Sequence, residues 1–505
     1  MSGRPNVLLI MVDQLAAQWL PAYGHAIVRA PNLDELAGRG AVFDAAYCAS
    51  PLCAPSRAAM LSGRHASAID VFDNAAELRA SVPTLAHLFR AAGYHTCLAG
   101  KMHFVGPDQL HGFERRLTTD VYPASLDWTP DWTRPVAERL PWYHSVDAVL
   151  TPARTVASMQ TDYDDEVAFH AVRHLHDLAR TRSDRPFLLV VSFTNPHDPW
   201  EVPARYWDLY DPSAIEPPAI AAVPLERADP HSRRLAQMSG LDEIEIADEQ
   251  VRRARHGYYA AISYVDERIG VVLSALSASG LGQDTVIAFT ADHGEFLGER
   301  GLWYKMSFLE PAARVPLFVC GPGVGSAGGR VPSPVSLIDV LPTLSELADV
   351  PLSGAEIDGV SLIGLLDGTG AGPERVICEY EAEGVTAPAA MVRSGRHKLI
   401  VCRTDPDQLF DLEADPLELS NLAGDPAHAA SLNALRGALE QQLDLGAIER
   451  RVLASQRERH LVARALATGA EAAWDYQPFV DASRQYVRTR EDLYDLQRVA
   501  RLETR

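Results

Sequence analysis

The fold of this chain is decided by residues 6–14, NVLLIMVDQ, where an unbroken apolar run ends at once in Asp13 and Gln14. Two later stretches have the same form: FLLVVSFTNPHDP at 187–199 and TVIAFTADHGE at 285–295. Short apolar runs that stop abruptly at polar residues are typical of strands buried on both faces of a parallel sheet. We therefore predict three buried parallel strands here.

Amphipathic stretches lie between these strands, for example residues 82–92 and 165–179. The alternation of buried strands with such stretches predicts an α/β fold with a doubly wound sheet. In sheets of this kind, ligands bind beyond the carboxyl ends of the strands. Because polar residues follow each predicted strand, we expect one crevice to collect Asp13, His197, Asp292 and His293.

The pattern of apolar and polar residues changes after about residue 372. Short β-like segments separated by polar turns indicate a small antiparallel subdomain, and from about residue 427 the pattern is helical and highly charged. Residues 364–373 are rich in Gly and Pro, as expected at a boundary. We predict an α/β domain at 1–370, an antiparallel-sheet subdomain at 371–445 and a tail at 446–505.

The composition limits the partners and the location of the protein. The chain has 46 Lys and Arg against 67 Asp and Glu, a formal net charge of −21. This charge disfavours binding to nucleic acid or anionic membranes, and any site for an anion must concentrate positive charge locally. No segment resembles a signal peptide or a membrane span, and the six cysteines lack CxxC spacing. We expect a soluble cytoplasmic protein without a disulfide framework.

Cys53-Ala-Pro55-Ser56-Arg57 precedes a short helix-forming stretch. A nucleophile at this position would lie at the positive end of a helix, where free N–H groups favour developing negative charge, and Arg57 adds a fixed cation. A buried cysteine before an ordinary helix fits these few residues equally well.

Two short motifs place an imidazole near a strand end. Lys101-Met-His103 follows an apolar stretch, and in an extended segment residues i and i+2 point to the same face, so Lys101 and His103 would be presented together. His197 lies between two prolines, which stiffen its surroundings. A surface lysine beside a hydrogen-bonded histidine is an equal alternative for the first motif. A loop histidine bonded to the backbone is the alternative for the second.

Asp13, Asp292 and His293 offer oxygen and nitrogen ligands from two strand ends, which suits a divalent cation. Taken singly, an aspartate at a strand end is usually a helix cap or a turn residue.

Together these motifs resemble the sulfatase family of the alkaline phosphatase superfamily. Cys53-x-Pro55-Ser56-Arg57, followed by LSGR at 61–64, is similar to the sequence recognised by the formylglycine-generating machinery. The resemblance implies that Cys53 is oxidised to formylglycine, whose hydrate supplies one hydroxyl to attack sulfur and a second to expel the product. It also implies a large, mixed, mostly parallel sheet sandwiched by helices, with a smaller C-terminal α+β subdomain.

The same resemblance assigns roles to the other residues. Lys101 and His103 would contact sulfate, with His103 taking the proton that breaks down the sulfated intermediate, and His197 and Lys305 would assist the leaving group. A single metal would be bound by Asp13, Gln14, Cys53, Asp292 and His293. Many sulfatases have Asp-Asp where this chain has Asp13-Gln14, and Asn in place of His293. Fewer carboxylates compensate a hard cation less well, so these residues leave calcium versus manganese open. The family resemblance makes calcium the first choice and manganese the alternative.

Within the family, the sequence most resembles the choline sulfatases. The segments that carry this resemblance include DNAAE at 73–77, GKMHFVGPDQLHG at 100–112, LTTDVY at 117–122 and LGERGLWYKMS at 297–307. The implied substrate is choline O-sulfate. A quaternary ammonium needs aromatic faces and a carboxylate, for which Trp128 and Glu383 are the candidates. In that group a C-terminal tail reaches the site of a neighbouring subunit, which adds Asp492 and Asp495 and implies a homo-oligomer, a dimer or tetramer.

Three alternatives remain open from the sequence. A phosphonate or phosphate monoester hydrolase of the same superfamily is less favoured, because such enzymes tend to lack the two histidines at positions 103 and 197. An arylsulfatase would share the whole chemistry. A non-catalytic binding protein would keep the fold without maturing Cys53, which otherwise requires a formylglycine-generating enzyme as a partner.

Overall fold

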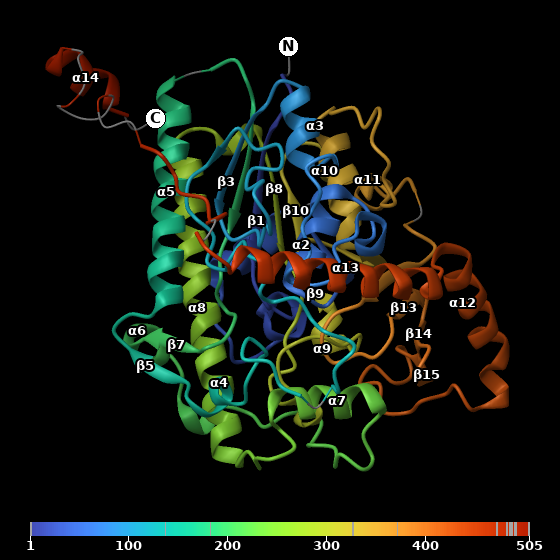
Figure 1. Cartoon of the computed structure of the whole chain (residues 1–505). Coiled ribbons are helices and arrows are strands. Elements are labelled where there is room, and N and C mark those ends of the chain that lie inside the picture. The colour runs from blue at the N-terminus through green and yellow to red at the C-terminus, as the bar shows by residue number, and fades with distance from the viewer. Residues whose placement is uncertain are drawn as a thin grey trace.

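The core of the molecule is a mixed, mostly parallel sheet between two layers of helices, with a small antiparallel sheet at one side (Figure 1). The predicted α/β fold is thereby confirmed. This computed structural model describes residues 3–136, 138–181, 183–325, 328–370, 372–470, 473–480, 483, 488 and 492–502.

The large sheet has the spatial order β11-β2-β10-β8-β1-β6-β3-β4, with β9 beside β2. Its strands are β1 (Asn6–Val12), β2 (Ala41–Tyr47), β3 (His95–Gly100), β4 (Arg115–Arg116), β6 (Phe187–Ser192), β8 (Thr285–Ala291), β9 (Arg314–Val315), β10 (Leu317–Cys320) and β11 (Gly329–Ser336). The three predicted strands are β1, β6 and β8, and they lie side by side and parallel. A two-stranded ribbon, β5 (Ala153–Thr155) with β7 (Glu201–Pro203), lies apart from this sheet.

The register of these strands brings their ends together. Val12 pairs with Ala291 across β1 and β8, and Met11 pairs with Ser192 across β1 and β6. The residues that follow each strand therefore emerge at the same edge of the sheet, as expected for parallel strands. Val7 to Val12 are fully buried, because helices cover both faces of the sheet.

In Figure 1, the long helices α5 and α8 lie together on one side of the sheet, and α2, α3 and α10 on the other. Of the two predicted amphipathic stretches, 165–179 lies within the longer α5, and 82–92 contains a shorter α3 capped by the Thr84 side chain. The helices are α1 (Pro31–Arg39), α2 (Cys53–Ser62), α3 (Leu85–Ala91), α4 (Asp147–Leu150), α5 (Met159–Thr181), α6 (Ala204–Trp207), α7 (Pro230–Ser239), α8 (Asp248–Ala278), α9 (Glu310–Ala313), α10 (Val340–Leu347), α11 (Ile363–Leu366), α12 (Ala429–Gln442), α13 (Leu445–Leu466) and α14 (Leu493–Ala500).

The C-terminal sheet is antiparallel, as the texture of the sequence predicts. It consists of β12 (Val376–Tyr380), β13 (Ala389–Ser394), β14 (His397–Cys402) and β15 (Asp405–Asp411). Leu435 and Leu439 of α12 pack on this sheet. Helix α13 runs across the front of the molecule, and α14 stands away from its body (Figure 1). The three-part division at residues 370/371 and 445/446 stays a prediction.

Among the described residues, no helix combines the length and the apolar character needed to cross a bilayer. The six cysteines are buried free thiols.

Candidate functional site

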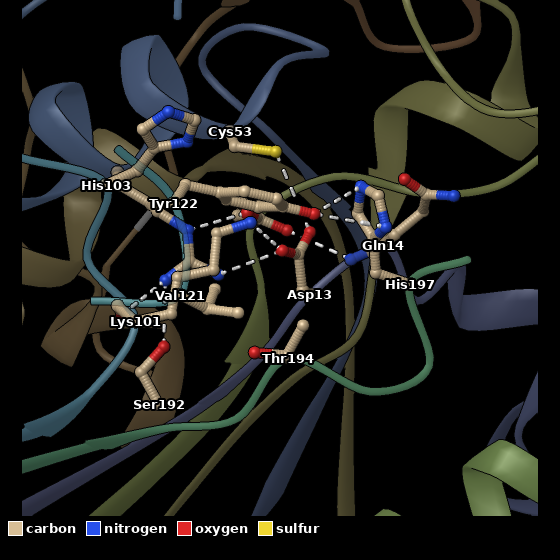
Figure 2. A network of polar contacts seen from close by, with 12 residues as sticks. Asp13, Gln14, Cys53, Lys101, His103, Val121, Tyr122, Ser192, Thr194 and His197 are labelled. Carbon is tan, nitrogen blue, oxygen red and sulfur yellow. Dashed lines mark hydrogen bonds and ion pairs between the residues drawn. The ribbon is translucent and has the colours of Figure 1, made fainter. Parts of the chain in front are cut away.

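Several predicted site residues meet at the carboxyl edge of the large sheet, and Figure 2 shows Asp13, Gln14, Cys53, Lys101, His103 and His197 there. Asp13 follows β1, and Asp292 and His293 follow β8. All three are fully buried. The paired ends of β1 and β8 bring these residues together. The backbone amide of Gln14 donates a hydrogen bond to Asp292 Oδ1 at 3.1 Å, although the two residues are 278 positions apart in the sequence.

Cys53 is the first residue of α2, with Pro55 in the first helical turn, as predicted. Its Sγ lies 3.2 Å from His293 Nε2 and 3.8 Å from Asp13 Oδ1. Burial raises the pKa of a thiol, but the charges of Lys101, Lys305 and His293 outweigh it and hold the pKa of Cys53 well below its usual range. The first turn of α2 faces the same crevice, so residue 53 lies where an anion is favoured.

Three buried cations supply the local positive charge that the acidic chain requires: Arg57, Lys101 and Lys305. The Lys101 ammonium pairs directly with Asp13 Oδ2, and Arg57 Nε donates to Asp292 Oδ2 at 2.7 Å. Burial raises the pKa of Asp13, but Lys101, His197 and Arg57 outweigh it, so the net pKa is lowered and the carboxylate is ionised. The Arg57 Nη2 has no hydrogen-bond partner among the described residues.

Of two donor clusters in the described residues that could hold a metal, one surrounds residue 53 and the other consists of His144, His197 and Asp198. Ligand atoms of Asp13, Cys53, Asp292 and His293 all lie within 4.8 Å of one another. His293 Nε2 points to both carboxylates, at 3.5 Å from Asp13 Oδ1 and 3.6 Å from Asp292 Oδ1. Two ionisable carboxylates and an imidazole, buried and convergent, fit a single divalent cation.

The side chain of Gln14, a predicted metal ligand, makes its hydrogen bonds to residues outside the donor cluster around residue 53. Its Oε1 accepts from Lys305 Nζ at 2.5 Å, and its Nε2 donates to Glu295 Oε2 at 2.6 Å. Its role as a ligand stays a prediction. Gln14 links this donor cluster to Lys305, because its backbone amide donates to Asp292 and its side-chain oxygen accepts from Lys305.

Lys305 and His197 form a pair, as predicted, with 2.8 Å between Lys305 Nζ and His197 Nε2. Burial and Lys305 lower the pKa of His197, but the Asp198 and Asp13 carboxylates outweigh them and raise it. Burial likewise lowers the pKa of Lys305, and the surrounding acidic groups raise it above its usual value. The Lys305 ammonium is therefore protonated near neutral pH and can donate to His197 Nε2.

Glu295 was not assigned a role from the sequence, and it organises the Lys305 loop. Its Oε1 accepts from the backbone amides of Leu297 and Tyr304, each at 2.7 Å. Tyr304 has a φ of 66°, so the backbone beside Lys305 is in the left-handed region. The carboxylate thus holds an uncommon loop conformation that directs Lys305 inward.

The expectation that Lys101 and His103 share one face of an extended segment is wrong. Strand β3 ends at Gly100, and His103 has a φ of 58°, in the left-handed region. A turn, held by hydrogen bonds from the amides of Met102 and His103 to Asp120, brings both side chains to the site instead. The His103 imidazole is buried, and neither of its nitrogens has a hydrogen-bond partner among the described residues.

Tyr122 lies at the centre of the network in Figure 2 and was missed from the sequence. Lys101 Nζ is 4.1 Å from the centre of its ring, and its hydroxyl lies 3.3 Å from His197 Nε2. Only its presence in the segment at 117–122 pointed to it. Burial raises the pKa of Tyr122 well above its usual value, so its hydroxyl is a neutral donor.

Trp128 belongs to an aromatic wall that begins at the catalytic imidazole candidate. Ring centres of Trp128 lie 5.9 Å from His103, 5.3 Å from Tyr122 and 6.3 Å from Trp142, with the two indoles stacked. Trp142 in turn contacts Tyr143 edge to face. The sequence indicated only the first tryptophan of this wall.

Glu383 lines the same small hollow as Tyr143 of the wall. It is buried, and one of its carboxylate oxygens has no hydrogen-bond partner among the described residues. Burial raises the pKa of Glu383 to about 7, Lys305 lowers it, and the Glu383 charge in turn raises the pKa of Tyr143. A cation without N–H groups would require such a combination of a buried carboxylate and aromatic rings.

Asp492 and Asp495 are exposed and flank the start of α14, where the Asp495 amide donates to Asp492 Oδ1 at 3.1 Å. Helix α14 stands away from the body of the molecule (Figure 1). The assignment of Asp492 and Asp495 to a neighbouring site stays a prediction.

Comparisons with known protein families match residues 5–350 to the family described as sulfatase. Residues 298–444 match the N-sulphoglucosamine sulphohydrolase C-terminal family, and residues 450–502 match the choline sulfatase C-terminal family.

Among individual proteins, the chain is 46% identical over 505 residues to a choline-sulfatase of Rhizobium meliloti, covering 98% of each chain. It is 28% identical to an arylsulfatase of Clostridium perfringens, covering 87% of this chain and 95% of the relative. Among solved structures, the phosphonate monoester hydrolase of Agrobacterium radiobacter is similar, with a TM-score of 0.69 and 27% identity over 88% of this chain and 96% of that one.

Proposed function

Because this chain belongs to the sulfatase family and is a sulfuric ester hydrolase, we propose that it hydrolyses choline O-sulfate to choline and sulfate. The observation that carries the proposal is that residues suited to a sulfate group lie next to residues suited to a quaternary ammonium group. Three buried cations surround residue 53, and Tyr122 beside them begins a row of aromatic contacts through Trp128 and Trp142 to Tyr143. Tyr143 lines the same small hollow as Glu383, one of whose carboxylate oxygens has no hydrogen-bond partner among the described residues. The cations suit a sulfate group, and the aromatic rings with the carboxylate suit a quaternary ammonium. The 46% identity to a choline-sulfatase supports the same substrate.

We propose that Cys53 is converted to formylglycine by a maturation enzyme before catalysis. Hydrated formylglycine at residue 53 would supply one hydroxyl to attack sulfur and a second to release sulfate. Its position at the first residue of α2, beside His293 and Asp13, supports this assignment.

The residues around it handle charge and protons. Arg57 and Lys101 neutralise the sulfate group, and His197 or Lys305 gives a proton to the ester oxygen as the sulfur–oxygen bond breaks, so that choline leaves as an alcohol. His103, whose nitrogens are unpartnered, accepts the proton released when sulfate departs from residue 53.

We propose that the donor cluster of Asp13, Cys53, Asp292 and His293 binds calcium, with manganese as the alternative. When bound, the metal would polarise a sulfate oxygen and offset negative charge. Chelation is expected to abolish turnover, and dialysis against each metal in turn should restore it with the native ion only. Restoration by neither calcium nor manganese would contradict the assignment.

The substrate is tested by comparing kcat/KM for choline O-sulfate, 4-nitrophenyl sulfate and a phosphonate monoester, on protein whose Cys53 conversion has been quantified by intact mass. We expect choline O-sulfate to exceed the others by at least about 10²-fold, since the alternatives lack a group for the carboxylate end. Preference for either alternative identifies an arylsulfatase or a phosphonate hydrolase. Full-length protein with unmodified Cys53 and no turnover supports the binding-protein alternative.

The pH dependence of choline selectivity tests Glu383. Burial disfavours the carboxylate and raises the pKa of Glu383 from the usual 4.5 to about 7 in the folded protein. The contribution of Glu383 to folding stability is therefore fully present below pH 4.5, where the group is neutral. It is lost as the pH rises through 7. The substrate cation offsets the cost of the ionised form. We expect KM for choline O-sulfate to fall between pH 6 and 8 relative to KM for 4-nitrophenyl sulfate.

In Glu383→Gln this differential pH dependence should vanish, and the variant should melt at a higher temperature than wild type at pH 8. Equal pH profiles for both substrates in the wild type would remove Glu383 from the cation site.

We also propose a homo-oligomer in which α14 of one protomer approaches the site of another. The exposed Asp492 and Asp495, on a helix that stands away from its own body, support this arrangement.

A further inference from the structure

We propose that Arg459 and Gln456 of α13 are positioning residues that set selectivity for the cationic end of the substrate, by fixing within the same chain the loop that presents Trp128. This inference rests on the proposed substrate. Helix α13 lies across the front of the molecule, far from the sheet edge in sequence but against the loop at 124–132 in space (Figure 1).

Arg459 is the anchor of this contact. It is 9% exposed, and its two terminal nitrogens donate to the two carboxylate oxygens of Asp73 at 2.6 and 2.7 Å. A bidentate pair of this kind fixes orientation as well as distance. Asp73 is fully buried, and its neighbour Asn74 accepts a hydrogen bond from the Ala54 amide at 3.0 Å, directly beside residue 53. Through Asp73 and the adjacent Asn74, Arg459 thus connects α13 to the first turn of α2, where residue 53 lies.

The same guanidinium reaches the loop that carries Trp128. Arg459 Nη1 lies 3.3 Å from Thr129 Oγ1, and this hydroxyl closes the preceding turn by donating to the Leu126 carbonyl at 2.7 Å. Trp128 lies inside that turn. Its indole meets the His103 ring edge-on and packs at a tilt against Tyr122, so a shift of the turn moves the aromatic wall relative to these two residues.

Gln456, one helical turn earlier, holds the other end of the loop. Its Oε1 accepts from the Trp132 amide at 3.0 Å, and the Trp132 indole donates to the Ala382 carbonyl at 2.9 Å. Ala382 precedes Glu383, so this chain of contacts ties the aromatic wall to the carboxylate. His460 adds a contact of 3.1 Å between its Nε2 and the Pro130 carbonyl.

None of these α13 side chains is proposed to touch substrate or the reacting atoms. Their effect should therefore fall on recognition of the ammonium group and spare sulfate chemistry. A residue that only stabilised the fold would lower turnover of every ester alike.

The test compares Arg459→Met and Gln456→Met with Arg457→Met, a matched control because Arg457 is exposed on the same helix. The readout is the ratio of kcat/KM for choline O-sulfate to that for 4-nitrophenyl sulfate, in full-length protein of equal Cys53 conversion. We expect this ratio to fall at least about tenfold in the first two variants, through KM for choline O-sulfate, and to stay unchanged in the control. Gln456→Glu, which keeps an acceptor for the Trp132 amide, should retain most of the ratio.

Hydrogen–deuterium exchange gives a second readout that does not depend on turnover. Peptides covering residues 126–132 should exchange faster in Gln456→Met than in the control, because the Trp132 amide loses its acceptor. If Arg459→Met does not fold, Gln456→Met decides the question alone, since it leaves the Arg459–Asp73 pair intact.

An unchanged ratio in both variants, or an equal loss for both esters, overturns the inference. Failure of the proposed substrate is seen separately, because the wild-type enzyme itself would then not prefer choline O-sulfate.

Discussion

Replacing Cys53 by alanine is expected to lower kcat/KM for every sulfate ester by at least about 10⁴-fold, the scale on which loss of a covalent nucleophile is felt. The residue begins α2 amid a cluster of cations, and Asp13 and His293, which its Sγ contacts, belong to the proposed metal donor set. Binding of the sulfate group by Arg57 and Lys101 should survive in part, so product or sulfate should still protect the variant against thermal unfolding.

Cys97→Ala is the matched control. Cys97 lies on strand β3, is as buried as Cys53, and lies outside the donor cluster. It should keep turnover within about threefold of wild type, with only the modest loss of stability that a small cavity causes. Turnover of Cys53→Ala within tenfold of wild type would remove residue 53 from the chemistry.

Lys305→Ala is expected to lower kcat for choline O-sulfate by about 10²- to 10⁴-fold, and kcat for 4-nitrophenyl sulfate by far less. An alkyl alcohol is a poor leaving group as an alkoxide and needs a proton or a strong cation at the ester oxygen, whereas a nitrophenolate leaves without one. Lys305 is fully buried and contacts His197 and Gln14, which together hold it toward the pocket.

The measurement is kcat for the two esters under saturating substrate, with melting temperature as the check on folding. Removing Lys305 also takes a cation from beside Cys53, so the degree of formylglycine conversion must be matched between variant and wild type. Equal loss for the two esters would mean that Lys305 serves sulfate binding alone and that His197 is the proton donor.

Sequence reasoning succeeded where local pattern and chemistry coincide. The three apolar runs are core strands because a strand buried on both faces must be apolar throughout, and β1, β6 and β8 are adjacent and parallel. Cys53 begins a helix because Pro55 fits only its first turn. The prediction that Lys101 and His103 share one face of an extended segment was wrong. Spacing alone cannot reveal that His103 adopts a left-handed backbone conformation, which a hydrogen bond to Asp120 holds.

The sequence by itself determined the α/β class, the strand-end positions of Asp13, His197 and Asp292, and the motif around Cys53. Only the tertiary structure decided how these side chains are used. It pairs Gln14 with Lys305 and Glu295, puts Tyr122 between Lys101 and His197, and brings α13 onto the loop of Trp128. The physical reason is that strand and helix periodicities are set by neighbours in the chain, whereas these contacts join segments tens to hundreds of residues apart, whose meeting depends on sheet order, register and loop conformation.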